Sequence, residues 1–262
     1  ALCIHNEYSD EIDCLSDELV LNENINGENT ARGKIKLSTI TINLARLGLK
    51  YSIDQIEDFY KELEETLELS KNALLQRYEL QASLYKENYK YIFENSMLYD
   101  TKRLEDNKRV RKVLRNGILN ISFSGLLEAC EALIKNDNNI KIMDLSLEII
   151  KFMQKKINDY TNELKLNFEL SEENNNLINK KLLGLDKTMY GNIDILKKDS
   201  YSTISSYLNK LGDNLKYKYA LKYQNLCQYN LNIIINKSKV LEEIYLANKS
   251  KIKIIRVMIK WK

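Results

Sequence analysis

Few side chains in this sequence could carry out chemistry, and cysteine is the foremost of them. His5 is the only histidine, which removes histidine-based metal clusters and disfavours a Ser-His-Asp triad. The cysteines lie far apart and form no Cys-x-x-Cys pair, so neither a zinc knuckle nor a disulfide framework is expected; they are Cys3, Cys14, Cys130 and Cys227. Chemistry would therefore run on cysteine, carboxylate or amide groups, and no metal site is expected.

Two positions are candidates for such chemistry. Cys14 stands between Asp13 and Leu15 in a polar stretch rich in acids, an environment that disfavours a reactive thiolate. Asn43 follows an apolar run, where an amide most simply caps the next turn. Taken alone, Cys14 is a free thiol and Asn43 a capping amide. Cys130 lies on an apolar helical face and is expected in the core.

Composition excludes several classes of protein. Hydrophobic residues make up 44% of the 262 positions, enough for a packed core. A net charge of +3 is far from the basic balance of a dedicated nucleic-acid binder. The basic excess in residues 237–262 is interpreted as a solvated helix and strand edge rather than a polyanion site. No apolar run is long enough for a membrane helix, and the first residues do not form a signal peptide, so a cytoplasmic protein without nucleic-acid or membrane partners is expected.

The elements that must position these groups follow from periodicity. Residues 34–43 alternate β-branched and apolar types, as in a strand buried on both faces. Asp54 begins a long amphipathic helix with an acidic outer face. The first 30 residues lack a period, and residues 22–29 have the Asn and Gly content of an exposed loop. Further helices are predicted at 125–134, 142–164 and 240–248, and further strands at 164–170, 231–236 and 252–259, which gives a mixed α/β fold with a β-α-β crossover near the end.

Several short motifs occur in the order of a known family. Residues 24–28 read Asn-Ile-Asn-Gly-Glu, and residues 41–48 read Thr-Ile-Asn-Leu-Ala-Arg-Leu-Gly. Residues 160–168 read Tyr-Thr-Asn-Glu-Leu-Lys-Leu-Asn-Phe. Shorter matches follow the same order at 58–63, 74–79, 116–128, 186–191, 198–203 and 223–227. Together they resemble the large subunit of the anaerobic, glycyl-radical ribonucleoside-triphosphate reductases.

That resemblance implies a fold and a reaction. The fold is a helix-rich part of a ten-stranded α/β barrel, with residues 1–262 as one incomplete catalytic-barrel unit: a loop region at 1–33, a strand with long helices at 34–170, and an α/β continuation at 171–262. The reaction is radical reduction of ribonucleoside triphosphates to deoxyribonucleoside triphosphates, started when a thiyl radical abstracts the ribose 3′ hydrogen. Cys14 matches the thiyl position, with Cys3 as the second choice. Asn43 matches the asparagine near the substrate ribose, and Cys227 matches a family position without an assigned role.

Several departures from the family pattern predict an inactive isolated chain. Asp13 and Leu15 replace the Gly and Arg around the family's cysteine, and Ala45 replaces its proline. Residues 171–175 read Ser-Glu-Glu-Asn-Asn instead of Ala-Thr-Pro-Ala-Glu, which would place negative charge where a triphosphate approaches. The family's glycyl radical and zinc site are expected outside this chain, so no cofactor is expected within it. The absence of proline and the start at Ala1 favour an internal piece of a drifting gene, although removal of Met or trimming explains the start equally well.

The partners implied by the resemblance are a ribonucleoside-triphosphate substrate, nucleotide effectors, a radical-SAM activating protein and a second copy of the chain. Two alternatives stay open. One is a non-catalytic helical scaffold or interaction protein whose long amphipathic helices serve association. The other is a different glycyl-radical enzyme.

Overall fold

The structure is a computed structural model that describes residues 2–5, 12–15, 18–21, 24–28, 33–135, 138–191, 193–229 and 231–260. Its centre is a sheet of three parallel strands in the order β4-β5-β6, formed by β4 (Lys36–Asn43), β5 (Ile118–Ser124) and β6 (Asn167–Glu172). Thr41 pairs with Ser122, and Ser122 pairs with Ser171. The carboxyl ends of the three strands therefore meet at one edge of the sheet.

The two faces of this sheet differ in chemistry because side chains alternate along each strand. One face is apolar, with Ile42, Ile121 and Leu170 all buried. The other carries hydroxyl and amide groups in cross-strand rows, in which Asn120 bonds to Ser171 and Thr41 lies 3.3 Å from the Ser122 hydroxyl. The prediction that β4 is buried on both faces is wrong, since its polar face is partly exposed at Thr39.

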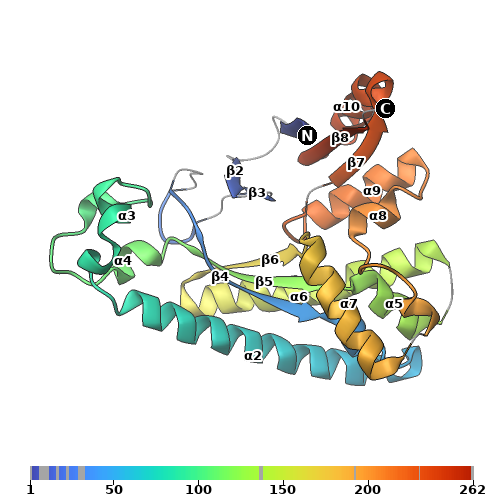
Figure 1. Ribbon diagram of the computed structural model, residues 1–262, viewed down its shortest axis with the longest axis horizontal. Helices are drawn as coiled ribbons and strands as arrows, with labels where there is room; N and C mark the ends of the chain where they lie inside the picture. The colour runs from blue at the N-terminus through green and yellow to red at the C-terminus, as the bar shows by residue number, and fades with distance from the viewer. Residues whose placement is uncertain are drawn as a thin grey trace.

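Two long helices cover the apolar face, α2 (Ile56–Ala82) and α6 (Asn139–Leu164). Figure 1 shows both helices on one side of the sheet, and α2 packs on β4 and β5 while α6 packs on β6. The amphipathic pattern explains why α2 forms, since Phe59, Leu63 and Leu67 are fully buried and lie four residues apart. Asn138 caps α6 by accepting from two backbone N–H groups.

Shorter helices gather at the carboxyl end of the sheet and beyond it (Figure 1). They are α1 (Leu44–Gly48), α5 (Leu126–Ile134), α7 (Asn176–Tyr190), α8 (Ile204–Leu208) and α9 (Asp213–Gln224). The connection from α2 to β5 contains α3 (Lys90–Glu94) and α4 (Arg111–Leu114). Single 3-10 turns lie at Ile53–Gln55, Lys86–Tyr89, Thr101–Arg103, Asp194–Leu196 and Lys237–Lys239.

A second sheet has the order β1-β8-β7, from β1 (Leu2–His5), β7 (Leu231–Asn236) and β8 (Ile254–Lys260). β7 and β8 are parallel and are joined by α10 (Val240–Lys249), so the predicted β-α-β crossover is confirmed. A third sheet is the antiparallel hairpin of β2 (Ile12–Leu15) and β3 (Glu18–Leu21). In Figure 1 this hairpin lies on the side of the central sheet away from α2 and α6.

Most of the other predicted elements are confirmed, and one strand begins later than predicted. The predicted helices at 125–134 and 142–164 and the strand at 231–236 are confirmed as α5, α6 and β7. The strand predicted at 164–170 begins only at Asn167, because α6 continues through Leu164. The mixed α/β, helix-rich class is confirmed, while the described residues form three separate sheets and no closed barrel.

The predicted exposed loop at 22–29 is confirmed for its described residues, which form a turn with Ile25, Gly27 and Glu28 exposed, but the loop region predicted for residues 1–33 also contains strands. Strands β1, β2 and β3 lie within the first 30 residues, and Asn24 is buried. Asn24 donates to Asn116 at 3.1 Å and accepts from Asn167 at 3.0 Å, so the Asn-Ile-Asn-Gly-Glu segment is held against the amino ends of β5 and β6. β1 and the Asn24 bonds were missed because their partners lie more than 90 residues away in the sequence. The β2–β3 hairpin is local, but each of its strands has only four residues, too few to show a clear period.

Candidate functional site

Asn43 lies at the point where β4 ends and α1 begins. Its backbone is extended, and its side-chain oxygen accepts a hydrogen bond of 3.2 Å from the backbone N–H of Arg46. Asn43 is therefore the N-cap residue of α1, and the capping role expected for it is confirmed. The cap uses the amide oxygen and leaves the amide nitrogen to a second partner.

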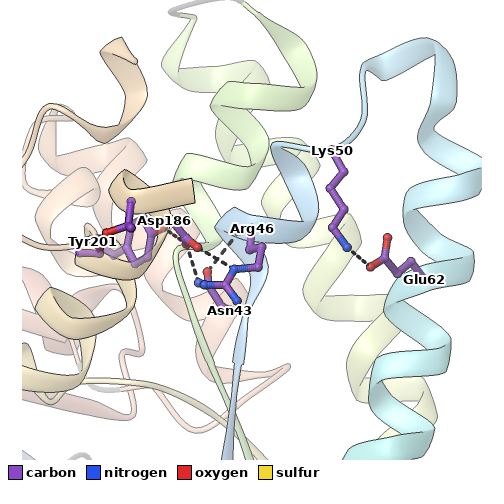
Figure 2. Close-up of polar contacts among 8 residues, drawn as sticks. Asn43, Arg46, Lys50, Glu62, Asp186 and Tyr201 are labelled. Carbon is purple, nitrogen blue, oxygen red and sulfur yellow. Dashed lines mark hydrogen bonds and ion pairs between the residues drawn. The ribbon is translucent and has the colours of Figure 1, made fainter. Parts of the chain in front are cut away.

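That partner is Asp186, a fully buried residue on α7. Nδ2 of Asn43 donates to Oδ2 of Asp186 at 2.6 Å, and Nε of Arg46 donates to Oδ1 at 2.6 Å. The hydroxyl of Tyr201 also donates to Oδ2. Figure 2 shows Asn43, Arg46 and Tyr201 converging on this carboxylate. A buried carboxylate is tolerated when it is paired and hydrogen-bonded, and these three donors satisfy that condition.

The network has one charge of each sign. The Arg46 side chain is 33% exposed and the Asp186 side chain is fully buried, so the ion pair extends from the interior to the surface. Burial and the hydrogen bond to Asp186 raise the pKa of Tyr201, which keeps its hydroxyl neutral and able to donate. A satisfied buried network is rigid, so the Asn43 amide is held in one orientation.

A second polar cluster lies one row away on the same face of the sheet. The Thr41 hydroxyl donates to Oε2 of Glu173 at 2.9 Å, and the Ser122 hydroxyl donates to the same oxygen at 3.3 Å. Oε1 of Glu173 accepts from the backbone N–H of Asn175 at 2.9 Å. Glu173 is 8% exposed. Its carboxylate thus occupies the polar end of the sheet as an internal anion.

This geometry corrects the expected charge of the altered loop. Glu172 and Glu173 were expected to face an incoming triphosphate, but both are buried. Glu172 accepts from the backbone N–H of Ile204 at 2.5 Å, and Glu173 points at Thr41 and Ser122. Donors from β4, β5 and the start of α8 draw the two carboxylates inward, so they do not form a free negative surface.

A polar groove of about 440 Å³ adjoins the Asp186 network. Lys198 lines the groove, but its amino group is paired with Glu128 at 2.9 Å and Glu131 at 3.2 Å. Burial alone would lower the pKa of Lys198, and the two carboxylates outweigh it, so the pKa is raised. Lys210 is an exposed cation of the groove. The other lining residues are mainly amides and hydroxyls, namely Asn174, Asn176, Asn179, Asp199, Ser200, Tyr201, Ser202, Thr203 and Ser206. Tyr201 both lines the groove and binds Asp186, so it connects the groove to Asn43.

The cysteines are distributed over different parts of the fold. Cys14 lies on β2 opposite Leu19, and Cys3 lies on β1; the surroundings of both side chains lie outside the described residues. The described contacts therefore do not bring Cys14 and Asn43 together. Cys130 is fully buried, as predicted, and Cys227 is 8% exposed. Burial raises the pKa of both thiols well above the ordinary value, so neither is a ready thiolate.

In the described part of the chain, no cluster of three or more His, Cys, Asp or Glu side chains could hold a metal ion. No described helix has the length and apolar character to cross a membrane.

Sequence reasoning found Asn43 and missed its partners. Asp186 and Tyr201 belong to the family-like motifs at 186–191 and 198–203, but those motifs predicted no role for either side chain. A signal for Asp186 was present, because Asn179, Leu183 and Asp186 recur at three- and four-residue steps and form the buried face of α7. A charged residue on the buried face of a helix requires a partner.

The family model of the anaerobic ribonucleoside-triphosphate reductases matches residues 9–232. The chain belongs to this family. The match covers the three strands of the central sheet, both long helices, Asn43 and Asp186, so the family resemblance predicted from the motifs is confirmed. No curated protein sequence matches this reductase-family chain.

Solved reductase structures share the fold of this family member. An anaerobic ribonucleotide reductase matches at 15% identity and a TM-score of 0.64, covering 88% of this chain and 36% of its own. The enzyme from Thermotoga maritima with citrate in the active site matches at 16% identity and a TM-score of 0.65, covering 88% and 41%. The same enzyme in complex with dATP and CTP matches at 15% identity and a TM-score of 0.62, covering 89% and 38%. The chain thus spans 36–41% of the length of these structures, and at such identities the likeness concerns the fold.

Proposed function

We propose that this chain serves the radical-based reduction of ribonucleoside triphosphates to deoxyribonucleoside triphosphates, the reaction of its family. The observation that carries the proposal is the link from Asn43 through Asp186 to Tyr201 and the polar groove. It places an oriented amide and a donor-rich groove at the carboxyl end of one parallel sheet, where α/β folds bind their ligands.

In this proposal each group has a separate task. The Asn43 amide orients the ribose, since Asp186 and the α1 cap fix its position. Cys14 carries the thiyl radical, abstracts the ribose 3′ hydrogen and later returns it, while the 2′-hydroxyl leaves as water. The radical source and the two reducing electrons come from outside residues 9–232. The isolated chain is accordingly expected to be inactive, and its residues supply orientation and shielding.

The groove is the proposed position of the substrate phosphates. Lys210 provides a cation, and the hydroxyl groups along residues 200–206 with the amides along residues 174–179 provide hydrogen-bond donors around the single lining acid, Asp199, which suits phosphate oxygens. The inward orientation of Glu172 and Glu173 supports this, because it keeps their charge away from the groove wall.

The central sheet is proposed to be part of the wall of an α/β barrel. The long helices α2 and α6 cover its apolar face, and its other face carries rows of polar side chains, as the lumen of a ligand-binding barrel would. Nucleotide effectors, a radical-SAM activating protein and a second copy of the chain are the further partners proposed. One solved relative carries dATP in a specificity site.

A nucleotide-binding experiment tests the proposal on the chain itself. We expect CTP or ATP to bind in isothermal titration calorimetry, and Lys210→Ala to weaken binding about five- to tenfold through loss of one charge-assisted contact. Lys181→Ala is the matched control, because Lys181 is exposed on α7 and does not line the groove. Equal affinity of the Lys210→Ala and Lys181→Ala variants would contradict the phosphate assignment.

The alternative of a non-catalytic scaffold has less support. It relies on the long helices being available for association, yet the apolar face of α2 packs on β4, β5 and α6. The residues that gave the helix its amphipathic pattern are fully buried inside the chain's own fold.

A further inference from the structure

A separate cavity of about 180 Å³ lies at the other end of β6 from Asn43. It is bordered by the first residues of β6, by the last turns of α6 and by the turn that follows α9. Ile118, Phe168 and Leu226 line it with apolar surface, and Gln154, Asn158 and Asn167 contribute amide groups. Glu169 and Lys253 are the charged lining residues, one of each sign, so the cavity favours a ligand without net charge.

The edge of β6 presents an unused pair of backbone groups to this cavity. Gln228 occupies one rung of a parallel ladder: its N–H donates to the Leu170 carbonyl at 2.8 Å, and its carbonyl accepts from the Glu172 N–H at 3.3 Å. The N–H and carbonyl of one strand residue point to the same side. The Leu170 N–H and the Phe168 carbonyl therefore also point outward, at the position of the next rung.

No described residue fills that rung. The chain turns away at Leu226 and Cys227, whose N–H groups bond back to the Tyr223 carbonyl at the end of α9. Among the described residues, no hydrogen bond reaches the Phe168 carbonyl or the Leu170 N–H from this side. One acceptor and one donor, two residues apart on a strand edge, thus face a cavity lined by apolar and amide side chains.

The neighbouring contacts limit what can bind there. The Thr161 hydroxyl accepts from the Phe168 N–H at 3.3 Å, and the Gln228 N–H donates to the Leu170 carbonyl. A single rung is therefore open, and an added peptide strand could form no further backbone pairs. The volume is below the roughly 300–1,000 Å³ of pockets for drug-sized ligands. A single planar ring system suits it better than a whole nucleotide does.

We propose that this cavity binds a neutral planar heterocycle whose edge carries a hydrogen-bond donor beside an acceptor, of the adenine type. The exocyclic amino group would donate to the Phe168 carbonyl, and the adjacent ring nitrogen would accept from the Leu170 N–H; adenine presents such a pair. The site is distinct from the proposed substrate groove because it lies at the amino end of β6, and it does not depend on the reductase reaction.

Two matched purines test the proposal. The probe is 9-methyladenine, and the control is 6-(dimethylamino)-9-methylpurine, which has the same ring but no donor. We expect 9-methyladenine to move the amide proton resonance of Leu170 downfield in a nitrogen-15 NMR titration. The control should bind at least about fivefold more weakly, since the hydrogen bond to the Phe168 carbonyl is lost, and should therefore move that resonance only at correspondingly higher concentrations.

Protein variants locate the binding. Asn158→Trp should abolish the titration by filling the mouth of the cavity, because Asn158 is exposed on α6 and lines it. Lys155→Trp, on the same helix but not in the lining, should bind as the unmodified chain does. Lys210→Ala should also leave 9-methyladenine binding unchanged, which separates this site from the substrate groove. No shift of Leu170, equal affinity for the two purines, or full binding by Asn158→Trp would overturn the proposal.

Discussion

The Asp186 carboxylate accepts a hydrogen bond of 2.6 Å from the Asn43 amide, across a separation of 143 residues in the sequence. The bond joins the carboxyl end of β4 to α7, beside an apolar cluster in which Ala45 of α1 packs with Leu183 of α7. Arg46 and Tyr201 bond to the same carboxylate. Asp186 therefore fixes the orientation of Asn43 and, together with the apolar cluster, holds α7 at the edge of the sheet.

Asp186→Ala is expected to lower the free energy of unfolding by about 3 kcal/mol, because it leaves the Asn43 amide and the Tyr201 hydroxyl without their acceptor and Arg46 without its counter-ion. Urea unfolding followed by circular dichroism measures the change. Arg46→Met should cost less, since the Asn43 amide and the Tyr201 hydroxyl still donate to the carboxylate and the Arg46 side chain it replaces is 33% exposed, so water can take the place of the lost donor. If the two variants lose the same stability, the network does not depend on the buried carboxylate.

Glu173 allows a test of the second polar cluster by paired substitution. Glu173→Gln is expected to cost less than about 1 kcal/mol, because the Thr41 and Ser122 hydroxyls can rotate to accept from an amide as readily as they donate to a carboxylate. Glu173→Ala should cost about 2 kcal/mol, since it leaves those hydroxyls and the Asn175 N–H without a partner. Urea midpoints give both values. A large loss for Glu173→Gln would mean that the negative charge itself is required.

The elements predicted from the sequence have a local pattern, whereas the contacts between side chains at the site depend on distant partners. Helix α2 was found because its apolar residues recur at helical steps. No strand was predicted at β5, although Leu119, Ile121 and Phe123 alternate with Asn120, Ser122 and Ser124. Residues 116–128 were interpreted only as a family-like motif. All seven residues of the strand are buried. At the site, Asn43 followed from position and motif. Its pairing with Asp186 could not be predicted, because a contact between side chains 143 residues apart produces no pattern in either segment.

Alkaline pH should destabilise the fold, in part because Tyr60 ionises. Burial, and secondarily the charge of Glu148, raise the pKa of Tyr60 to about 12, against about 10 in an unfolded chain. The folded state thus favours the neutral phenol. The stabilisation that Tyr60 gives the folded state is therefore complete below about pH 10 and is lost as pH rises towards 12.

The variant Tyr60→Phe keeps the ring contact with Phe152, whose centroid is 4.9 Å away, and removes the ionisable hydroxyl. Urea midpoints between pH 9 and pH 12 should fall less steeply for this variant than for the unmodified chain. Tyr91→Phe, at a side chain that is 71% exposed, should leave the slope unchanged. Identical slopes for Tyr60→Phe and the unmodified chain would show that Tyr60 ionises as easily in the folded state as in the unfolded one.

Gly48 closes the motif that begins at Thr41, and its lack of a side chain lets α1 approach α5. A Cβ atom at Gly48 would lie 2.5 Å from Cα and 2.7 Å from the carbonyl oxygen of Ala129. Both are backbone atoms, so neither can move without shifting α5. Gly48→Ala is therefore expected to destabilise the fold by about 2–3 kcal/mol through overpacking, although alanine is otherwise the better helix former.

Gly184 is the matched control, because it lies within α7 and a Cβ atom there would meet nothing within 4 Å. Gly184→Ala should raise the free energy of unfolding by about 0.5–1 kcal/mol, since alanine restricts the unfolded chain and favours the helix. The two substitutions are chemically identical, so opposite signs in urea unfolding would isolate the α1–α5 contact as the cause. Stabilisation by Gly48→Ala would mean that the two helices do not meet at this distance, and that α1, with the Asn43 amide that caps it, is not held against α5.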